Sequence, residues 1–380
     1  MHKNIFFILL LSIFTLLGYA QENTEVSFFD NNDSMLDLSE YLSRAYGFMP
    51  IPSVITEPAV GYGGGAALIY LHDSFIGRKG KSGRNIPASI SGIVAGATEN
   101  GTWLAGAFHL GYYLDDTLRT QTFVGYPDIN INFYTNRGDP VLMNLSGPAL
   151  YQSLKYRIGG SDLFVGLGYS YIDLTNTIKS KNTDNLPEGS FVNSGLHFLV
   201  DYDTRDNSLS PNRGMIFNAN LAFFDKAIGS KYSYRRYMFQ ELLYLPLFKT
   251  LFFDQRFYYS LVSGEEAPFF SYPFIQMRGV PAMKYQGEKV AQYEAQLRWE
   301  FHRRWSVLGF VGMGRAYGKD KFFPQLPEIP FKDADTIVSG GAGFRYLIAR
   351  KFGLRVGIDV AASEEDSAVY IKFGTAWMGL

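Results

Sequence analysis

The stretch Val290-Ala-Gln-Tyr-Glu-Ala-Gln-Leu-Arg-Trp-Glu-Phe301 alternates without a break between two kinds of residue. The first set is mostly polar and consists of Val290, Gln292, Glu294, Gln296, Arg298 and Glu300. The second set is apolar and consists of Ala291, Tyr293, Ala295, Leu297, Trp299 and Phe301. Because successive side chains of a strand point to opposite faces, the stretch predicts a strand with one polar and one apolar face. Such a strand fits a soluble sheet covered by a second layer, or a membrane barrel whose apolar face meets lipid.

Other expected strands repeat this division. Within 352–362, the apolar set Leu354, Val356, Ile358 and Val360 opposes Gly353, Arg355, Gly357 and Asp359. Within 368–378, the apolar set Val369, Ile371, Phe373 and Trp377 opposes Lys372, Gly374 and Ala376. A soluble protein would need a second apolar set to cover these faces, and the opposing sets are glycine, charged or otherwise small residues. The pattern therefore favours a membrane barrel.

Turn signals divide the chain into about sixteen expected antiparallel strands. They are 59–71, 87–98, 101–113, 117–126, 129–135, 140–156, 161–175, 190–203, 214–225, 231–246, 250–263, 290–302, 305–317, 336–349, 352–362 and 368–378. The connections near Asn100, Pro127, Gly159, Pro246, Arg303 and Arg350 are tight, whereas 72–86, 176–189, 264–289 and 318–335 are long. Tight turns on one rim and long loops on the other are typical of an outer-membrane barrel, with the long loops facing outward.

The N-terminal region differs from the rest of the chain. Residues 1–20 combine Lys3, an apolar run and a final Ala20, which predicts a signal peptide. Residues 21–58 are expected to form a short periplasmic segment with one helix at 34–42, either resting on the following domain or plugging it. Residues 59–380 are expected to form the barrel domain in the outer membrane.

Composition excludes several function classes. The net charge of −1 argues against a nucleic-acid partner, and the absence of cysteine excludes disulfides and thiolate metal sites. The five histidines are scattered, and His197, near Asp201, is expected to be a solvated residue of the lumen rather than half of an acid–base pair. Since no nucleophile, phosphate-binding or metal-ligand motif is present, we expect no enzyme activity, no cofactor and no metal site.

Two motifs, at 200–214 and at Met277-Arg278-Gly279-Val280, resemble the BamA/TamA family of bacterial surface-antigen barrels. The stretch 200–214 (VDYDTRDNSLSPNRG) resembles the family's periplasmic turn between the eighth and ninth strands, through Asp203, Arg205, Asp206, Pro211, Arg213 and Gly214. Met277-Arg278-Gly279-Val280 resembles the motif of the family's sixth extracellular loop. The resemblance implies a barrel of sixteen strands whose long sixth loop folds back into the lumen.

The resemblance also implies partners for the loop motif. Arg278 is expected to meet acidic or amide groups inside the lumen, because a buried guanidinium needs fixed acceptors. On the twelfth expected strand these are Glu294 and Gln296. On the thirteenth, the family's Phe-x-Asp-x-Gly stands here as Phe310, Gly312 and Gly314, so the family's aspartate is missing.

Family members insert or export proteins at the outer membrane, and the resemblance implies such a role here. Residues 21–58 are too short for the periplasmic POTRA domains of many relatives, so we expect a barrel-only member that relies on a periplasmic partner. Outer-membrane lipid and client polypeptides are the other expected partners. Clients would enter between 59–71 and 368–378. The alternative is a passive channel or a scaffold barrel of a surface complex.

Overall fold

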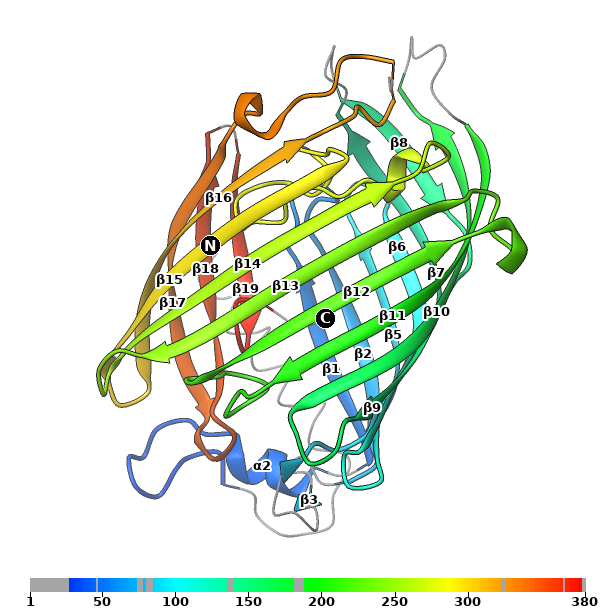
Figure 1. The fold of residues 1–380 in the computed structure, drawn as a ribbon. Helices are drawn as coiled ribbons and strands as arrows, with labels where there is room; N and C mark the ends of the chain where they lie inside the picture. The colour runs from blue at the N-terminus through cyan, green and yellow to red at the C-terminus, as the bar shows by residue number, and fades with distance from the viewer. Residues whose placement is uncertain are drawn as a thin grey trace.

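A computed structural model describes residues 27–45, 47–73, 78–79, 85–134, 140–180, 188–322, 325–364 and 366–377. The predicted signal peptide, 1–20, lies outside these residues. The described chain forms one sheet of 17 strands and a two-stranded sheet of β3 (Arg78–Lys79) and β4 (Asn85–Ile86). Figure 1 shows the large sheet curling round into a barrel. No helix among the described residues is long and apolar enough to cross a membrane.

The elements of the large sheet follow one another along the chain. Its strands are β1 (Gly47–Ile55), β2 (Gly63–Leu71), β5 (Ile90–Thr98), β6 (Trp103–Tyr113), β7 (Leu118–Phe133), β8 (Val141–Ser146), β9 (Ala149–Arg157), β10 (Leu163–Ile178), β11 (Gly189–Asp203), β12 (Gly214–Phe224), β13 (Tyr234–Pro246), β14 (Leu251–Ser263), β15 (Lys289–His302), β16 (Trp305–Tyr317), β17 (Ile337–Ala349), β18 (Leu354–Ser363) and β19 (Ser367–Phe373). The helical elements are α2 (Ser39–Arg44) and the 3₁₀ turns η2 (Lys226–Ile228), η3 (Phe269–Ser271), η4 (Phe331–Asp333) and η5 (Arg350–Phe352).

Each strand pairs antiparallel with the next, as in a meander. β8 and β9 both pair with β7 and with β10, so they are two halves of one strand, interrupted at Gly147-Pro148, and the 17 strands fill 16 positions. This confirms the predicted fold. Among the described residues, the registers run without a gap from β1 to β19, and none joins β19 to β1. We call the boundary between these two end strands the seam.

Burial along β15 shows which solvent each face meets. The polar set is inside: Glu294 is 2% exposed and Arg298 4%. The apolar set is outside: Leu297 is 48% exposed and Trp299 54%. A soluble protein would bury the second set and hydrate the first, whereas a barrel in lipid does the reverse. The expected orientation of this strand is therefore correct.

The count of sixteen is correct although two expected strands are wrong. The expected strands 117–126 and 129–135 are one strand, β7, which continues through Pro127. The first strand is β1 at Gly47–Ile55, inside the segment that we expected to precede the barrel. Both errors arose from proline. It usually marks a turn, but it is also tolerated at sheet edges and at irregular positions within a strand. Pro127 lies beside the Gly147-Pro148 interruption, where the Gly147 N–H donates to the Pro127 carbonyl.

Because β1 precedes them, the described parts of the connection between β2 and β5 lie on the opposite rim from the one expected. Leu71 and Ala88, on either side of it, pack with Leu42 beside α2, and the labels of α2 and β3 stand together at one end of the barrel (Figure 1). The same inversion places the tight turn at Asn100 on the outer rim. From 140 onward, the long and short connections alternate as predicted.

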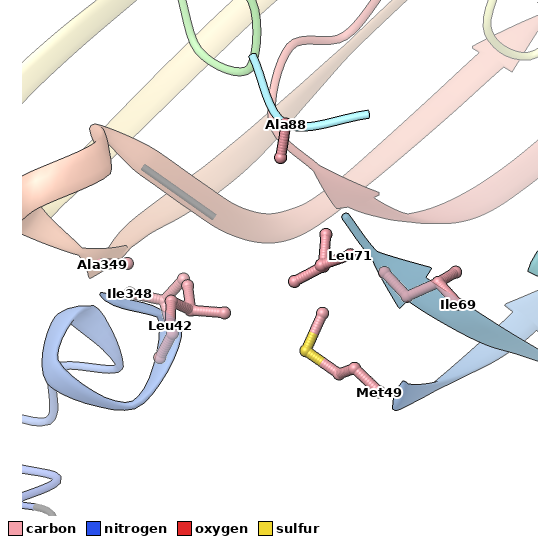
Figure 2. Packing of buried hydrophobic residues seen from close by; sticks show 7 residues of the cluster. All are labelled: Leu42, Met49, Ile69, Leu71, Ala88, Ile348 and Ala349. Atoms are coloured by element: carbon pink, nitrogen blue, oxygen red, sulfur yellow. The ribbon is translucent and has the colours of Figure 1, made fainter. Parts of the chain in front are cut away.

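The N-terminal segment packs against the end of the barrel where the tight turns lie. Its helix is α2, five residues later in its start than expected, and Leu42 of α2 enters a cluster with Met49 of β1 and Ile348 of β17 (Figure 2). Arg304, in the turn between β15 and β16, is 2% exposed and forms ion pairs with Asp30, Asp33 and Asp37. The segment therefore rests on the end of the barrel that carries the tight turns.

Candidate functional site in the barrel lumen

The long connection between β14 and β15, residues 264–288, passes through the lumen and carries the loop-six motif. Arg278, at its centre, is only 6% exposed. Met277 and Val280, on either side, pack with Ile275, Tyr258 and Val290. Apolar contacts on both sides of Arg278 thus fix the height at which its guanidinium lies inside the barrel.

Arg278 is held by polar groups from two different strands. Its Nη1 donates to Gln296 Oε1 on β15 at 3.0 Å and to Asp359 Oδ2 on β18 at 2.9 Å. Its Nε lies 3.7 Å from Glu294 Oε2. The structure thus brings both expected partners, Glu294 and Gln296, to Arg278 and adds Asp359. A guanidinium removed from water requires such fixed acceptors.

Both carboxylates also contact a second arginine. Glu294 Oε1 accepts from Arg256 Nη1 at 3.1 Å, and Asp359 accepts from Arg345 Nη1 and Nη2 at 2.6 and 3.0 Å. Three arginines therefore share two buried carboxylates. The site carries a net positive charge that only close geometry and further hydrogen bonds can stabilise away from water.

The thirteenth expected strand, β16, contributes an aromatic ring and two glycines to the site around Arg278, and no acidic side chain. The guanidinium carbon of Arg278 lies 3.5 Å from the centre of the Phe310 ring, a cation–π contact. A Cβ at Gly312 would lie 2.9 Å from Glu294 Cγ and 2.9 Å from Met277 Sδ, so any side chain there would displace the site. Gly314 faces Ile275 in the same way. Asp359, two strands further on, supplies a carboxylate to Arg278 instead.

The loop-six motif also contacts the hairpin of β18 and β19, the last in the sheet. The Gly279 N–H donates to Tyr370 Oη at 3.0 Å, and Ser363 Oγ donates to the Gly279 carbonyl at 2.9 Å. Gly279 has φ +85°, and a Cβ would lie 3.0 Å from the backbone of Ala362, so glycine is required. An ion pair of Lys284 with Asp366 adds a contact at the tip of the hairpin. Loop six therefore holds one side of the seam.

The C-terminal residues enter the same site. The strand ends at Phe373, because Gly374 takes φ +77° against the Leu209 carbonyl, and the chain turns inward. Trp377, expected on the lipid face, is 6% exposed and donates its Nε1–H to Glu294 Oε1 at 3.1 Å. Sequence alternation could not show this change of face. The only signal was Gly374 itself, three residues before the tryptophan.

The turn motif at 203–214 is closed by its own hydrogen bonds. Arg205 donates Nε and Nη2 to the two carboxylate oxygens of Asp203, each at 2.9 Å. Asp206 Oδ1 accepts from the backbone N–H groups of Asn212 and Arg213 at 3.0 and 3.2 Å, which closes the turn.

Beyond its own hydrogen bonds, the turn reaches distant strands. Asn212 Oδ1 accepts from Arg298 of β15 at 2.6 Å, and Asn207 donates to the Phe352 carbonyl at 2.7 Å. Pro211 is buried, Arg213 is exposed, and Gly214 has φ +103°. The motif therefore braces the end of the lumen, and its arginines do not reach Arg278.

A cavity of about 350 Å³ lies beside Arg278 and is bordered by Glu57, Glu294, Lys372 and Trp377. His197 is elsewhere: it bonds to Asn220 and Ser170 at 3.0 and 2.8 Å, whereas Asp201 pairs with Lys155. The described residues hold no group of three or more side chains arranged for a metal ion. The side chains around Arg278 form a charged contact between a loop and two strands.

Comparison with known proteins agrees with this geometry. No curated protein sequence matches the chain. The fold is similar to the crystal structure of BamA from Haemophilus ducreyi lacking POTRA domains 1–3, with TM-score 0.59 and 13% identity over 97% of this chain and 77% of that chain. It is also similar to CdiB from Escherichia coli, with TM-score 0.58 and 10% identity over 95% and 68%. Residues 112–375, more than half of the chain, match the Omp85 superfamily domain, and the protein is therefore a member of the Omp85 superfamily of outer-membrane β-barrels.

Proposed function

We propose that the protein acts in the insertion or export of polypeptides at the bacterial outer membrane, and that polypeptides enter through the seam. The observation that carries the proposal is that, among the described residues, no register joins β19 to β1, beside 15 continuous steps of pairing around the sheet. Backbone groups in a bilayer must find partners within protein. A seam without pairing is therefore a place where an added strand gains hydrogen bonds.

The contacts of loop six support this role. Arg278 binds Asp359 of β18, and Gly279 binds Tyr370 of β19, so the same motif holds the hairpin at the seam. Arg278 also binds Gln296 of β15, which belongs to the firmly paired wall. If the hairpin of β18 and β19 moves, these contacts must therefore break or move with it. The structure has a physical link between the lumen and the seam.

The passage of loop six through the lumen speaks against a passive channel. Near the outer rim, Phe269 of loop six packs on Phe133 and Phe322, with ring centres 4.9 and 5.3 Å apart. Phe270 packs on Phe191 at 5.5 Å. Loop six therefore places apolar rings at this level of the lumen and the arginine cluster, with its cavity of about 350 Å³, at the level of Arg278. In planar bilayers the intact protein should therefore conduct poorly, and steady large pores would support the channel alternative.

The absence of cysteine makes the seam testable by cross-linking. Cysteines replacing Val54 of β1 and Val369 of β19, both exposed on the outer face, would be joined by a short reducible cross-linker. We expect loss of client assembly, measured as a changed outer-membrane protein composition, and recovery after reduction. The matched control joins cysteines at Thr122 and Gln152, which face each other across β7 and β9. Unchanged composition in the cross-linked seam variant would refute entry through the seam.

A further inference from the structure

The two edges at the seam differ in their ability to donate hydrogen bonds. β1 contains Pro50 and Pro52, paired in register with Leu68 and Ala66 of β2. Proline has no N–H, so these must be the pairs that exchange no hydrogen bonds, and the bonds to β2 come from the intervening residues. Residues 50 and 52 therefore direct their backbone away from β2, toward the seam. At two successive positions, the seam edge of β1 has carbonyl acceptors and no donor.

The edge of β19 is complete. The Gly374 N–H donates to the Arg355 carbonyl at 2.7 Å, and the Ser363 N–H donates to the Asp366 carbonyl at 2.8 Å. These two bonds fix which β19 residues bond to β18, and the alternate ones face the seam. The seam-facing residues are Ser367, Val369, Ile371 and Phe373. None is proline, so each presents both an N–H and a carbonyl.

The outer face beside this edge suits lipid. Val369 is 42% exposed and Phe373 64%, whereas Ala368, between the seam-facing positions, is 5% exposed. On the inner face, Tyr370 binds loop six. A strand that joins β19 would continue both faces if its own residues alternated between apolar and polar. That is the pattern of a strand from another outer-membrane barrel.

We propose that β19, and not β1, is the edge that receives a client strand. The occupant is an extended segment of an unfolded outer-membrane polypeptide that alternates between apolar and polar residues. Pro50 and Pro52 keep β1 from pairing fully with β19 and make β1 a poor template for strand addition. The inference rests on the proposed function, because it assigns the polarity of the same seam.

The test uses the full-length protein in liposomes. The probe is a urea-unfolded, eight-stranded outer-membrane barrel with a single cysteine in its last strand. Disulfide formation is compared between protein carrying Val369→Cys and protein carrying Val54→Cys, which are 42% and 57% exposed. We expect at least about tenfold more cross-linked probe at position 369. Equal yields, or more at position 54, would overturn the inference while leaving entry through the seam intact.

Two other outcomes are decisive. If the probe assembles without cross-linking at either position, entry through the seam fails, and the inference fails with it. If cross-linking at position 369 joins two copies of the protein instead of the probe, the edge is a dimer contact and the client assignment is wrong.

A variant without the two prolines tests whether Pro50 and Pro52 cause the preference of the client strand for β19. Replacing Pro50 and Pro52 together with valine restores two donors, so β1 should pair with β19 and compete with the probe. We expect cross-linking of the probe at position 369 to fall severalfold. The control replaces Pro127, which lies inside β7 away from the seam, and should leave the yield unchanged. An unchanged yield in the double variant, with the barrel still folded by its gel mobility before and after heating, would show that the prolines do not set the polarity.

Discussion

At the scale of single residues, the account depends on the burial of Arg278. Its side chain is only 6% exposed, and its guanidinium lies against Phe310, between carboxylates of β15 and β18. The desolvation of three arginines and two acids is costly, so the cluster is weak evidence for stability on its own. The cluster is, however, specific for arginine. A planar guanidinium can bind carboxylates along its edge and stack on the Phe310 ring with its face, and few other side chains can do both.

Replacing Arg278 with alanine should loosen loop six. Removing one member of a buried ion pair costs about 3–5 kcal/mol, and we expect the lower end because Glu294 and Asp359 each retain an arginine. Arg278→Lys should recover only part of the loss, since lysine lacks the fork and the flat face. Chemical unfolding in detergent and protease cleavage within loop six measure the effect. Arg213→Ala, at an exposed position of the turn motif, is the control and should change little.

Restoring the family's aspartate at Gly312 should destabilise this protein. A Cβ there would lie 2.9 Å from Glu294 Cγ, and the new carboxylate would stand beside an existing one. Overpacking of this kind costs about 1–3 kcal/mol. Gly312→Ala separates the steric part from the charge. A Gly312→Asp variant as stable as the parent in detergent unfolding would show that Asp359 has not replaced the missing acid.

At the scale of elements, the N-terminal segment is attached by charge as well as by apolar contacts. The hydrogen bond from Arg304 holds the pKa of Asp33 below its ordinary value. Burial of Asp37 opposes ionisation, but hydrogen bonds from Ser39 and Arg304 outweigh it and lower its pKa too. The segment crosses from β17 to β1, on the two sides of the seam, so its attachment affects how the seam is held.

This attachment should depend on pH. Because the folded pKa values of both aspartates are lowered, their contribution is complete above the unfolded pKa of about 3.9 and is lost as the pH falls through the lower folded values. Hydrogen exchange of residues 27–45 should therefore accelerate, relative to the strands, only below about pH 4. Arg304→Met should expose the segment already at pH 7 and remove this dependence. A segment equally protected at pH 3 and pH 7 would contradict the ion-pair account.

How far sequence predicts each element follows from its periodicity. β15 and β18 alternate cleanly, so their faces could be predicted, whereas the approach of Glu294 and Gln296 to Arg278 was implied only by the family resemblance of the loop motif. β1 could not, because its prolines and its first residue, Gly47, carry the signal of a turn and not of an edge strand. Asp359 was visible on a polar face, but its distance of 81 residues from Arg278 hid the contact. That contact is set by the curvature of the barrel, which no local pattern encodes.

At the scale of the whole molecule, the barrel separates two tryptophans that the sequence placed on the same kind of face. Trp299 is 54% exposed on the outside, and Trp377 is 6% exposed in the lumen. In liposomes of brominated lipid, a variant that keeps only Trp299 should be strongly quenched, and one that keeps only Trp377 should not. Strong quenching of Trp377 would show that the C-terminal residues continue along the wall.

The seam is the feature on which the functional account rests, and spin labels measure it directly. Labels at positions 54 and 369 are compared in liposomes with labels at 122 and 152, which are paired across β7 and β9. We predict strong dipolar broadening for the control pair and little for the seam pair, with broadening at the seam after Pro50 and Pro52 are both replaced by valine. Equal broadening for the two pairs in the unaltered barrel would mean that β1 and β19 are joined like any other neighbours, and would contradict the account.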